Sequence, residues 1–380
     1  MLTIFEIATS GKVCSTKECC QGILRGKMCR IEKISFARMV RPMKTTFATA
    51  LGSKNCATSV IVRVVLEGGQ VGTGEVPTSF IVKNETVPVI KEVLGQAREQ
   101  LIGFSIDHYS EIVKSFRGRW PEFHMTVSGL ETALFRAWLA KQKTSEYRYW
   151  GGHSDILETD ITIPFILQER DLQQWLTMII KKGFKKYKVK VSGDVAEDIK
   201  FVQGIERVLA DGVGDFAIRL DGNQGYTEQS CLKMLDELER ARIKVELFEQ
   251  PVRRDDYGGL RSVCKRSAVP IIVDETVFSP DDCKKVIDEN LAHGVNIKIA
   301  KSGIGESGEI LRIAKDAGLK VMMGCMTETM VGLSAAIYFA AGTGEFDYID
   351  LDSIHFLKHF GRYGDLTVQG SSYKIEAEQR

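Results

Sequence analysis

Three short segments of the chain share one pattern, an apolar run that ends at a carboxylate: FAIRLDGNQ (216–224), VELFEQP (245–251) and PIIVDET (270–276). A short apolar run bounded by glycine, proline or polar residues is typical of a buried β-strand. The pattern therefore predicts three successive buried strands, which end at Asp221, Glu249 and Asp274.

The same spacing continues on both sides of these segments. From Lys190 the chain reaches Asp221, Glu249, Asp274, Lys298, Glu328 and Asp350 in steps of 22 to 31 residues. This is about the length of one strand and one helix in a barrel of eight such units. We therefore expect an α/β fold, a TIM-like (β/α) barrel of eight strands. Its strands are expected near 161–166, 187–191, 216–220, 245–249, 270–274, 295–300, 320–324 and 348–352.

Helix signals lie between the expected strands. The stretch 194–210 begins with Asp194 and carries apolar residues at helical spacing, and another helix is expected to begin at Ser279 and Pro280. The alternation of strand and helix supports the barrel.

The 380 residues exceed one barrel and leave about 150 residues before its first strand. Residues 59–66 and 70–75 flank the turn 67–69 and predict a hairpin, and helices are expected at 86–102 and 126–143. The helix 126–143 is apolar on more than one face, which predicts that it is buried.

These observations predict an α+β capping domain before the barrel. The expected divisions are a poorly ordered extension (1–28), the capping domain (29–150), the barrel (151–352) and a segment that returns to the capping domain (353–380).

Composition excludes several classes of protein. With 44% hydrophobic residues and a formal charge of +1, nothing indicates a nucleic-acid binder or a membrane-surface protein. No apolar run of the first 28 residues is long enough for a membrane span. The nine cysteines indicate reduced thiols of a cytoplasmic protein. A zinc site formed by Cys14, Cys19, Cys20 and Cys29 is disfavoured, because their spacing is not that of paired CxxC motifs.

The three carboxylates at the strand ends suggest a metal site. Asp221, Glu249 and Asp274 offer only oxygen ligands, which suits Mg²⁺, with Mn²⁺ as an alternative. Such a cation polarises a substrate carboxylate and stabilises the dianion formed when the adjacent carbon loses its proton. Taken singly, each residue could instead cap a helix or carry a surface charge.

Lysines stand on both sides of this site. Lys188 and Lys190 are two residues apart and face the same side of their strand, and Lys298, four strands further round, is expected to face Lys190 across the barrel mouth. A lysine acts as a base only if its pKa falls, and we expect burial and Lys188 to lower the pKa of Lys190. Two opposed bases suit racemisation or epimerisation. The alternative, a solvated basic edge, would leave two idle lysines facing a barrel interior, which is costly.

The residues together resemble the muconate-lactonizing enzyme subgroup of the enolase superfamily. Lys188-Val189-Lys190 is similar to its KxK motif, Lys298 to its second lysine, and Asp221, Glu249 and Asp274 to its metal ligands. The resemblance implies the modified enolase type of (β/α) barrel, in which a lysine or histidine base acts beside Mg²⁺. The resemblance covers about residue 30 to the C-terminus, and the histidine of the mandelate racemase subgroup is absent from 320–329.

The pair Asp350 and Asp352 resembles the DxD motif with which dipeptide epimerases bind the free amino group of a dipeptide; the alternative is that one of them caps the next turn. The resemblance implies inversion of the Cα of the C-terminal residue by two-base, 1,1-proton transfer through a metal-stabilised enediolate. It also implies hydrogen bonds from Asn223 and Glu275 around the metal ligands, and Thr162 and Glu328 in the cavity wall.

Specificity is expected from two segments of the capping domain, 45–55 and 75–85. Alanyl-glutamate epimerases carry an arginine in the first of them, whereas Gly52 stands here, and Lys54 is the nearby residue that could supply the charge without a bidentate fork. The preferred dipeptide therefore stays open. The resemblance also leaves open an o-succinylbenzoate synthase or muconate cycloisomerase-type lyase, and a non-catalytic binding protein on the same barrel. It further implies a homo-oligomer.

Overall fold

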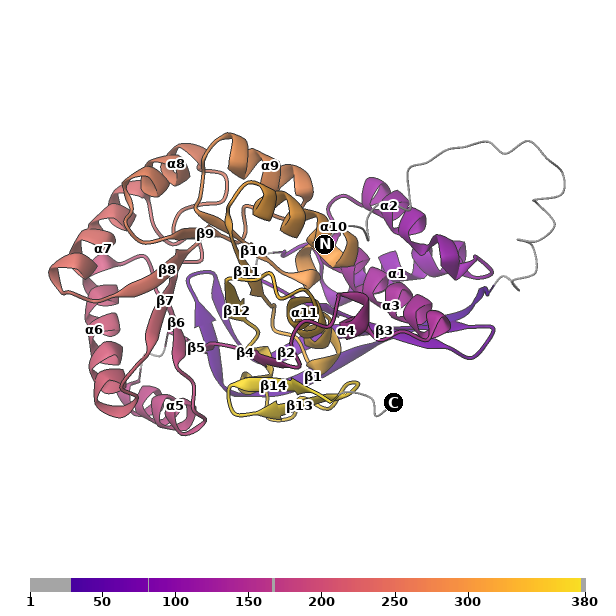
Figure 1. Cartoon of the computed structure of the whole chain (residues 1–380), viewed down its shortest axis with the longest axis horizontal. Helices are drawn as coiled ribbons and strands as arrows, with labels where there is room; N and C mark the ends of the chain where they lie inside the picture. The colour runs from indigo at the N-terminus through magenta and orange to yellow at the C-terminus, as the bar shows by residue number, and fades with distance from the viewer. Residues whose placement is uncertain (1–28, 81, 166–167, 377–380) are drawn as a thin grey trace.

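The computed structural model describes residues 29–80, 82–165 and 168–376, so the predicted extension 1–28 lies outside the described residues. Figure 1 shows a barrel surrounded by helices, and beside it a sheet packed against the helices α1 to α3. Among the described residues, none of the helices combines the length and the apolar character that a membrane span requires.

The barrel consists of eight parallel strands in the order β5 to β12. They are β5 (Ile161–Ile163), β6 (Lys186–Lys190), β7 (Ala217–Asp221), β8 (Val245–Glu249), β9 (Ile271–Val273), β10 (Gly294–Ile297), β11 (Lys320–Gly324) and β12 (Tyr348–Asp350). The first and last strands approach each other, where Asp160 N donates to Ile349 O at 3.3 Å. The predicted (β/α) barrel is confirmed, and the expected strands all overlap those observed.

Helices connect the strands on the outside of the barrel: α5 (Glu169–Lys181), α6 (Val195–Gly212), α7 (Glu228–Arg240), α8 (Tyr257–Arg266), α9 (Pro280–Asp288), α10 (Ile299–Asp316), α11 (Met330–Thr343) and the short α12 (Ser353–Phe356). The predicted helix starts are confirmed. The Asp194 side chain accepts from Ala196 N and Glu197 N, and Ser279 forms a capping box at the start of α9.

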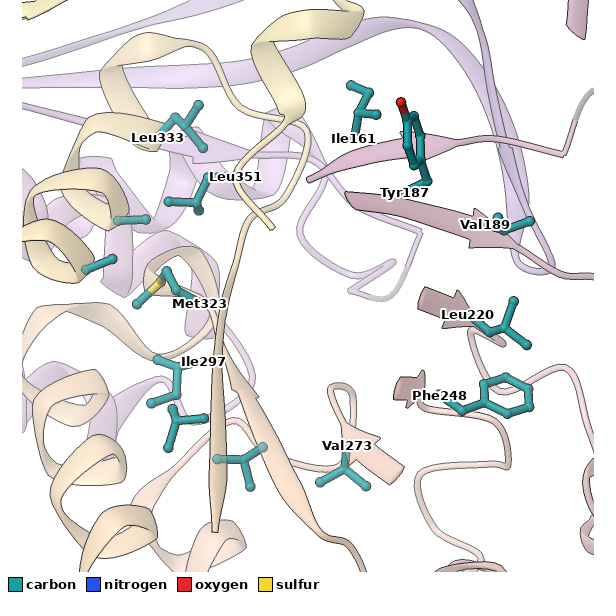
Figure 2. Close-up of a cluster of buried hydrophobic side chains, with 14 of the residues drawn as sticks. Ile161, Tyr187, Val189, Leu220, Phe248, Val273, Ile297, Met323, Leu333 and Leu351 are labelled. Atoms are coloured by element: carbon teal, nitrogen blue, oxygen red, sulfur yellow. The ribbon is translucent and has the colours of Figure 1, made fainter. Parts of the chain in front are cut away.

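Side-chain alternation along the strands separates two environments. In Figure 2, Tyr187, Val189, Leu220 and Phe248 belong to the large core between strands and helices, and each such side chain contributes about 1.5–3 kcal/mol on burial. The alternate positions face the barrel interior. Deep in that interior three apolar side chains form a separate cluster: Leu247, Ile272 and Met322. The interior positions at the C-terminal ends of the strands are charged, and they form the site described below.

The N-terminal domain is a three-stranded antiparallel sheet with helices on it. The elements are β1 (Ile31–Thr49), β2 (Gly52–Leu66), β3 (Val71–Pro77), α1 (Val87–Leu101), η2 (Ile106–His108), α2 (Tyr109–Arg119) and α3 (His124–Gln142). The helix α3 is buried along almost its whole length, as predicted. It lies directly on β3, because a Cβ atom at Gly72 would stand 2.0 Å from Ala133 O and one at Gly74 2.0 Å from Gly129 O.

The segment 45–55, from which specificity is expected, forms the tip of a β-hairpin. β1 continues to Thr49 and β2 begins at Gly52, and the pairing of the two strands has a register shift between Pro42 and Phe47. The tip reaches the barrel, where Phe165 N donates to Ala48 O at 3.4 Å. The two long strands β1 and β2 thus extend from the N-terminal domain to the barrel (Figure 1).

The C-terminal segment contacts both parts of the molecule. The backbones of Met43 and Leu357 form a bridge, and Lys358 N donates to Pro42 O at 3.0 Å. After it, β13 (Leu366–Gln369) and β14 (Ser372–Ile375) form a small sheet with β4 (Ile156–Glu158), which precedes the barrel and follows α4 (Glu146–Tyr149). The cysteines that the structure describes are free thiols.

Candidate active site

Side chains from the C-terminal ends of the strands meet in an open cavity. Its floor comes from the barrel: Thr162, Lys188, Lys190, Asn223, Lys298, Asp350 and Asp352. Its roof comes from the N-terminal domain: Phe47, Thr49, Leu51, Lys54, Ser79 and Phe80. The cavity therefore lies between the two parts of the chain, at the end of a barrel where active sites are found.

The three predicted metal ligands follow one another at the ends of β7, β8 and β9. Asp221, Glu249 and Asp274 are at most 1% exposed. Burial and the neighbouring Asp221 carboxylate raise the pKa of Glu249. Buried carboxylates on adjacent strands, with no histidine or cysteine among them, are a donor set that fits a hard divalent cation.

Each of these carboxylates contacts a cation or an amide of the protein. Asp221 Oδ2 accepts from Lys190 Nζ at 2.5 Å, and Asp274 Oδ2 accepts from Lys298 Nζ at 2.7 Å. Glu249 Oε1 accepts from Asn296 Nδ2 at 2.6 Å. The carboxylate oxygens thus lie within reach of both lysines.

The two lysines approach the cavity from opposite sides. Lys190 ends β6 and Lys298 follows β10, and three strands separate them on one side of the eight-stranded barrel. Burial alone would lower the pKa of Lys298, but the Asp274 and Glu249 carboxylates outweigh burial and raise this pKa. The Lys298 ammonium is therefore paired with a buried carboxylate in this structure.

Lys188 lies deeper than Lys190 and contacts carboxylates rather than the other lysine. Its Nζ donates to Asp350 Oδ2 and lies 3.5 Å from Glu249 Oε2 and 3.9 Å from Asp221 Oδ2. Burial opposes its charge, yet Asp350 and Glu249 raise the pKa of Lys188 well above its ordinary value. Lys188 is therefore a charged group that neutralises the cluster of acids beneath the cavity.

The Asp350 and Asp352 side chains meet on one side of the cavity. Carboxylate oxygens of Asp160, Asp350 and Asp352 all lie within 4.8 Å of one another, and all three residues are buried. Burial and Asp350 raise the pKa of Asp352 to about 6. The alternative that Asp352 caps the next turn is wrong, because its side chain makes no capping hydrogen bond and accepts instead from Thr162 N at 2.5 Å.

Asn223 links Lys190 to Asp221 and Glu275 through hydrogen bonds. Asn223 Oδ1 accepts from Lys190 Nζ at 3.1 Å, and Asn223 Nδ2 donates to Glu275 Oε1 at 3.3 Å. Burial and the adjacent Asp274 raise the pKa of Glu275 to about 8. Among the described residues, Glu275 Oε2 has no hydrogen-bond partner.

Glu328 does not line the cavity, in contrast to the expectation that it forms part of the wall. Its Oε2 atom accepts from Met326 N at 3.0 Å, and Thr327 lines the cavity instead. Burial and Glu75 raise the pKa of Glu328 to about 8. Glu75 itself accepts from Thr329 N, Thr329 Oγ1 and Gly332 N, so this turn is held by the N-terminal domain.

Lys54 lies in the roof, and its environment differs from that of the other cavity lysines. Lys188, Lys190 and Lys298 all have carboxylate partners, whereas no described residue forms an ion pair or hydrogen bond with Lys54. Its Nζ atom lies 5.3 Å from the centroid of the Phe80 ring. Burial lowers the pKa of Lys54 to about 8.

Two further buried cations were not found by reading the sequence. Lys301 is fully buried and donates to Asp274 Oδ1 and Asp274 O, each at 2.6 Å. Arg219 lies in the barrel interior and holds Asp160 through Nη1 at 2.7 Å. Lys301 stands one helical turn after Lys298, and this spacing is the signal that could have identified it.

The chain is similar in sequence to a family of known proteins and to individual members with known names. The family model for enolase C-terminal domain-like proteins matches residues 171–377. The L-Ala-D/L-Glu epimerase of Bacillus subtilis (strain 168) is 32% identical over 352 residues, which cover 91% of this chain and 94% of that protein. The aromatic dipeptide epimerase of Herpetosiphon aurantiacus is 30% identical over 346 residues, 91% of this chain and 96% of that protein.

A solved structure extends the similarity to the arrangement of both domains. The dipeptide epimerase of Enterococcus faecalis V583, complexed with Mg and the dipeptide L-Leu-L-Tyr, matches with a TM-score of 0.84 at 28% identity. The match covers 91% of this chain and 97% of that chain. The likeness therefore includes the roof of the cavity as well as its floor.

Proposed function

Since the chain belongs to the enolase C-terminal domain-like family, we propose that it inverts the Cα of the C-terminal residue of a dipeptide. The observation that carries this proposal is the position of Lys190 and Lys298 on opposite sides of one cavity. Inversion requires removal of a proton from one face of a carbon and delivery to the other, and two opposed amines meet that requirement.

Asp221, Glu249 and Asp274 are the residues that would hold a Mg²⁺ or Mn²⁺ ion. Three buried carboxylates with oxygen donors only fit such an ion, and the Enterococcus faecalis relative was solved with Mg. When bound, the cation would neutralise the substrate carboxylate and so make the neighbouring C–H bond more acidic.

The lysines carry the proton. One of Lys190 and Lys298 accepts the Cα proton as a free amine, while the other donates a proton to the opposite face as an ammonium. Asn223 orients Lys190 through its hydrogen bond, and Asp274 orients Lys298. After inversion the two lysines have exchanged protonation states, so the reverse reaction uses the same two groups.

Asp350 and Asp352 would bind the free amino group of the dipeptide. They face the cavity, and Asp160 adds a third carboxylate next to them. Lys188 already pairs with Asp350 and Arg219 with Asp160, whereas no described cation forms an ion pair with Asp352. The ammonium group of a dipeptide would supply that charge, whereas succinylbenzoate and muconate substrates carry no such group. The cluster therefore favours an epimerase over a cycloisomerase-type lyase.

The side chain of the inverted residue is expected to be acidic. The two named curated relatives differ in this side chain, so family membership does not decide it. The ammonium of Lys54 lies in the roof of the cavity, is partly buried and forms no ion pair with a described residue. A buried charge without a partner costs free energy. A carboxylate on the C-terminal residue of the dipeptide would pair with it.

Proton NMR in D₂O tests this function. A set of L,L-dipeptides with acidic, aromatic, aliphatic and basic C-terminal residues is incubated with the protein and Mg²⁺, and the Cα–H signal of that residue is followed. The expected result is loss of the signal and formation of the L,D product, fastest for the acidic residues. If no dipeptide exchanged its proton, the proposed function would be wrong, and turnover of the succinylbenzoate precursor or of muconate would support a lyase.

A further inference from the structure

The first turn of α10 is separated from the rest of that helix. It begins directly after Lys298, and Lys301 N and Ser302 N donate to Lys298 O at 2.9 and 3.1 Å. At Gly303 the backbone has φ 76° and ψ −177°, so the helix is interrupted after a single turn. The segment 299–302 is therefore a single helical turn, and Lys298 is the residue at its N-terminal end.

The N-terminal domain binds this turn at both ends. Ser128 Oγ donates to Ile299 O at the start, and Arg117 Nη2 donates to Ser302 O at 2.5 Å at the end. Between them, Ala300 packs in the apolar core of the N-terminal domain. On its other side the turn is tied to the barrel, because Lys301 donates to Asp274.

An ion pair occupies the break in the helix. Arg117 Nη2 donates to Glu131 Oε2 at 2.7 Å, and Glu131 Oε1 accepts from Gly305 N at 2.8 Å, where the longer part of α10 begins. A Cβ atom at position 303 would lie 2.0 Å from Glu131 Oε2 and 2.1 Å from Arg117 Nη2. The glycine thus supplies both the left-handed backbone and the space for the pair.

We infer that Arg117 and Glu131 are positioning residues for Lys298. Arg117 holds the carbonyl that ends the turn, and Glu131 holds both Arg117 and the amide that restarts the helix. Neither residue lines the cavity. Because a side chain displaced by about 1 Å can slow a reaction about a hundred-fold, this pair controls proton transfer without touching the substrate.

The inference rests on the proposed function and predicts an asymmetry between the two epimers. If Lys298 is displaced, Lys190 still removes the proton of the epimer whose Cα–H faces it. Its ammonium exchanges with D₂O and returns a deuteron to the same face, so that epimer exchanges without inverting. The epimer that faces Lys298 loses exchange and inversion together.

The test compares Glu131→Gln and Arg117→Lys with the parent protein, starting from each pure epimer in D₂O with Mg²⁺. Inversion is expected to fall about ten-fold or more, and the ratio of exchange to inversion is expected to rise about ten-fold for one epimer only. Arg312→Ala is the control on the same helix, since Arg312 pairs only with the exposed Asp316 in the described structure. The control should leave both ratios unchanged.

Circular dichroism and thermal unfolding establish that each variant is folded, and the two substitutions provide independent tests. The inference would be wrong if activity fell while the ratio of exchange to inversion stayed unchanged, or rose equally, for both epimers. General destabilisation would give that result, because it lowers the rates without distinguishing the two lysines. Absence of exchange in the parent protein would instead overturn the proposed function, and the inference with it.

Discussion

Lys190 Nζ lies 2.5 Å from Asp221 Oδ2, so a candidate base and a candidate metal ligand are bonded to each other. Lys298 and Asp274 repeat this arrangement on the other side of the cavity at 2.7 Å. Each lysine thus donates a hydrogen bond to one carboxylate, and in the proposed mechanism these pairs would couple proton transfer to cation binding.

Lys190→Ala is expected to abolish inversion in both directions, with a loss of about 10²–10⁴-fold, since the variant lacks one of the two proton carriers. Proton exchange of the epimer that faces Lys298 should persist. NMR in D₂O with each pure epimer measures both quantities. Lys298→Ala is the matched variant, and it should spare the opposite epimer; if either variant inverted dipeptides at the parental rate, the two-base mechanism would be wrong.

Asp352→Asn is expected to weaken dipeptide binding more than metal binding. The variant removes a buried negative charge next to the proposed ammonium site, and one charged hydrogen bond contributes about 1.5–3 kcal/mol, roughly a ten- to hundred-fold rise in KM. Calorimetric titration with Mg²⁺ should give nearly the parental affinity. N-acetylation of the dipeptide removes the same interaction from the substrate side, so it should slow the parent strongly and the variant little. Equal sensitivity of the two proteins to acetylation would contradict the assignment.

Binding of an acidic dipeptide is expected to depend on pH through Lys54. Its pKa is lowered to about 8, so the ammonium is present below pH 8 and is lost as the pH rises through that value. KM for a dipeptide with a C-terminal glutamate should therefore rise above pH 8, by up to about ten-fold per pH unit, while KM for an aliphatic dipeptide should not. Initial rates between pH 7 and about 9.5 measure this.

Lys54→Met provides the control for this pH dependence, because it preserves the length of the side chain without the charge. The variant should bind the acidic dipeptide weakly at every pH, and the difference between acidic and aliphatic dipeptides should disappear. An unchanged preference in Lys54→Met would show that another group selects the side chain.

The barrel and the site at its mouth could be predicted from the sequence because both depend on local patterns. An apolar run followed by a carboxylate, as at Asp221, specifies a strand and its polar end at once. The alternation of Lys188 and Lys190 with apolar neighbours specifies which side chains face inward. Regular spacing of such runs then determines the number of strands.

The parts that could not be predicted depend on contacts between distant segments. Arg219 lies within an apolar run, and only the fold brings it to Asp160. Glu328 accepts from Met326 N in a turn that Glu75 of the N-terminal domain holds, and it does not line the cavity. Lys54 is buried where its hairpin covers the barrel. None of these relationships has a signal within one helix or strand.

Gly72→Ala is expected to destabilise the N-terminal domain, because its backbone contacts α3 directly. A Cβ atom there would lie 2.0 Å from Ala133 O and 2.3 Å from Ala137 N, atoms of a buried helix that cannot move aside cheaply. Overpacking of this kind costs about 1–3 kcal/mol or more, which urea unfolding measures as a lower midpoint. Since α3 also carries Ser128 and Glu131, the substitution should lower the rate of inversion as well.

The matched control is Gly95→Ala in the helix α1, where an added Cβ meets nothing within 4 Å. Alanine is favoured over glycine in a helix by about 0.8–1 kcal/mol, so this variant should be slightly more stable than the parent. Opposite shifts of the two unfolding midpoints would support direct contact between β3 and α3. A Gly72→Ala variant as stable as Gly95→Ala would mean that the helix and the strand can separate, and that the N-terminal domain does not hold the turn after Lys298 rigidly.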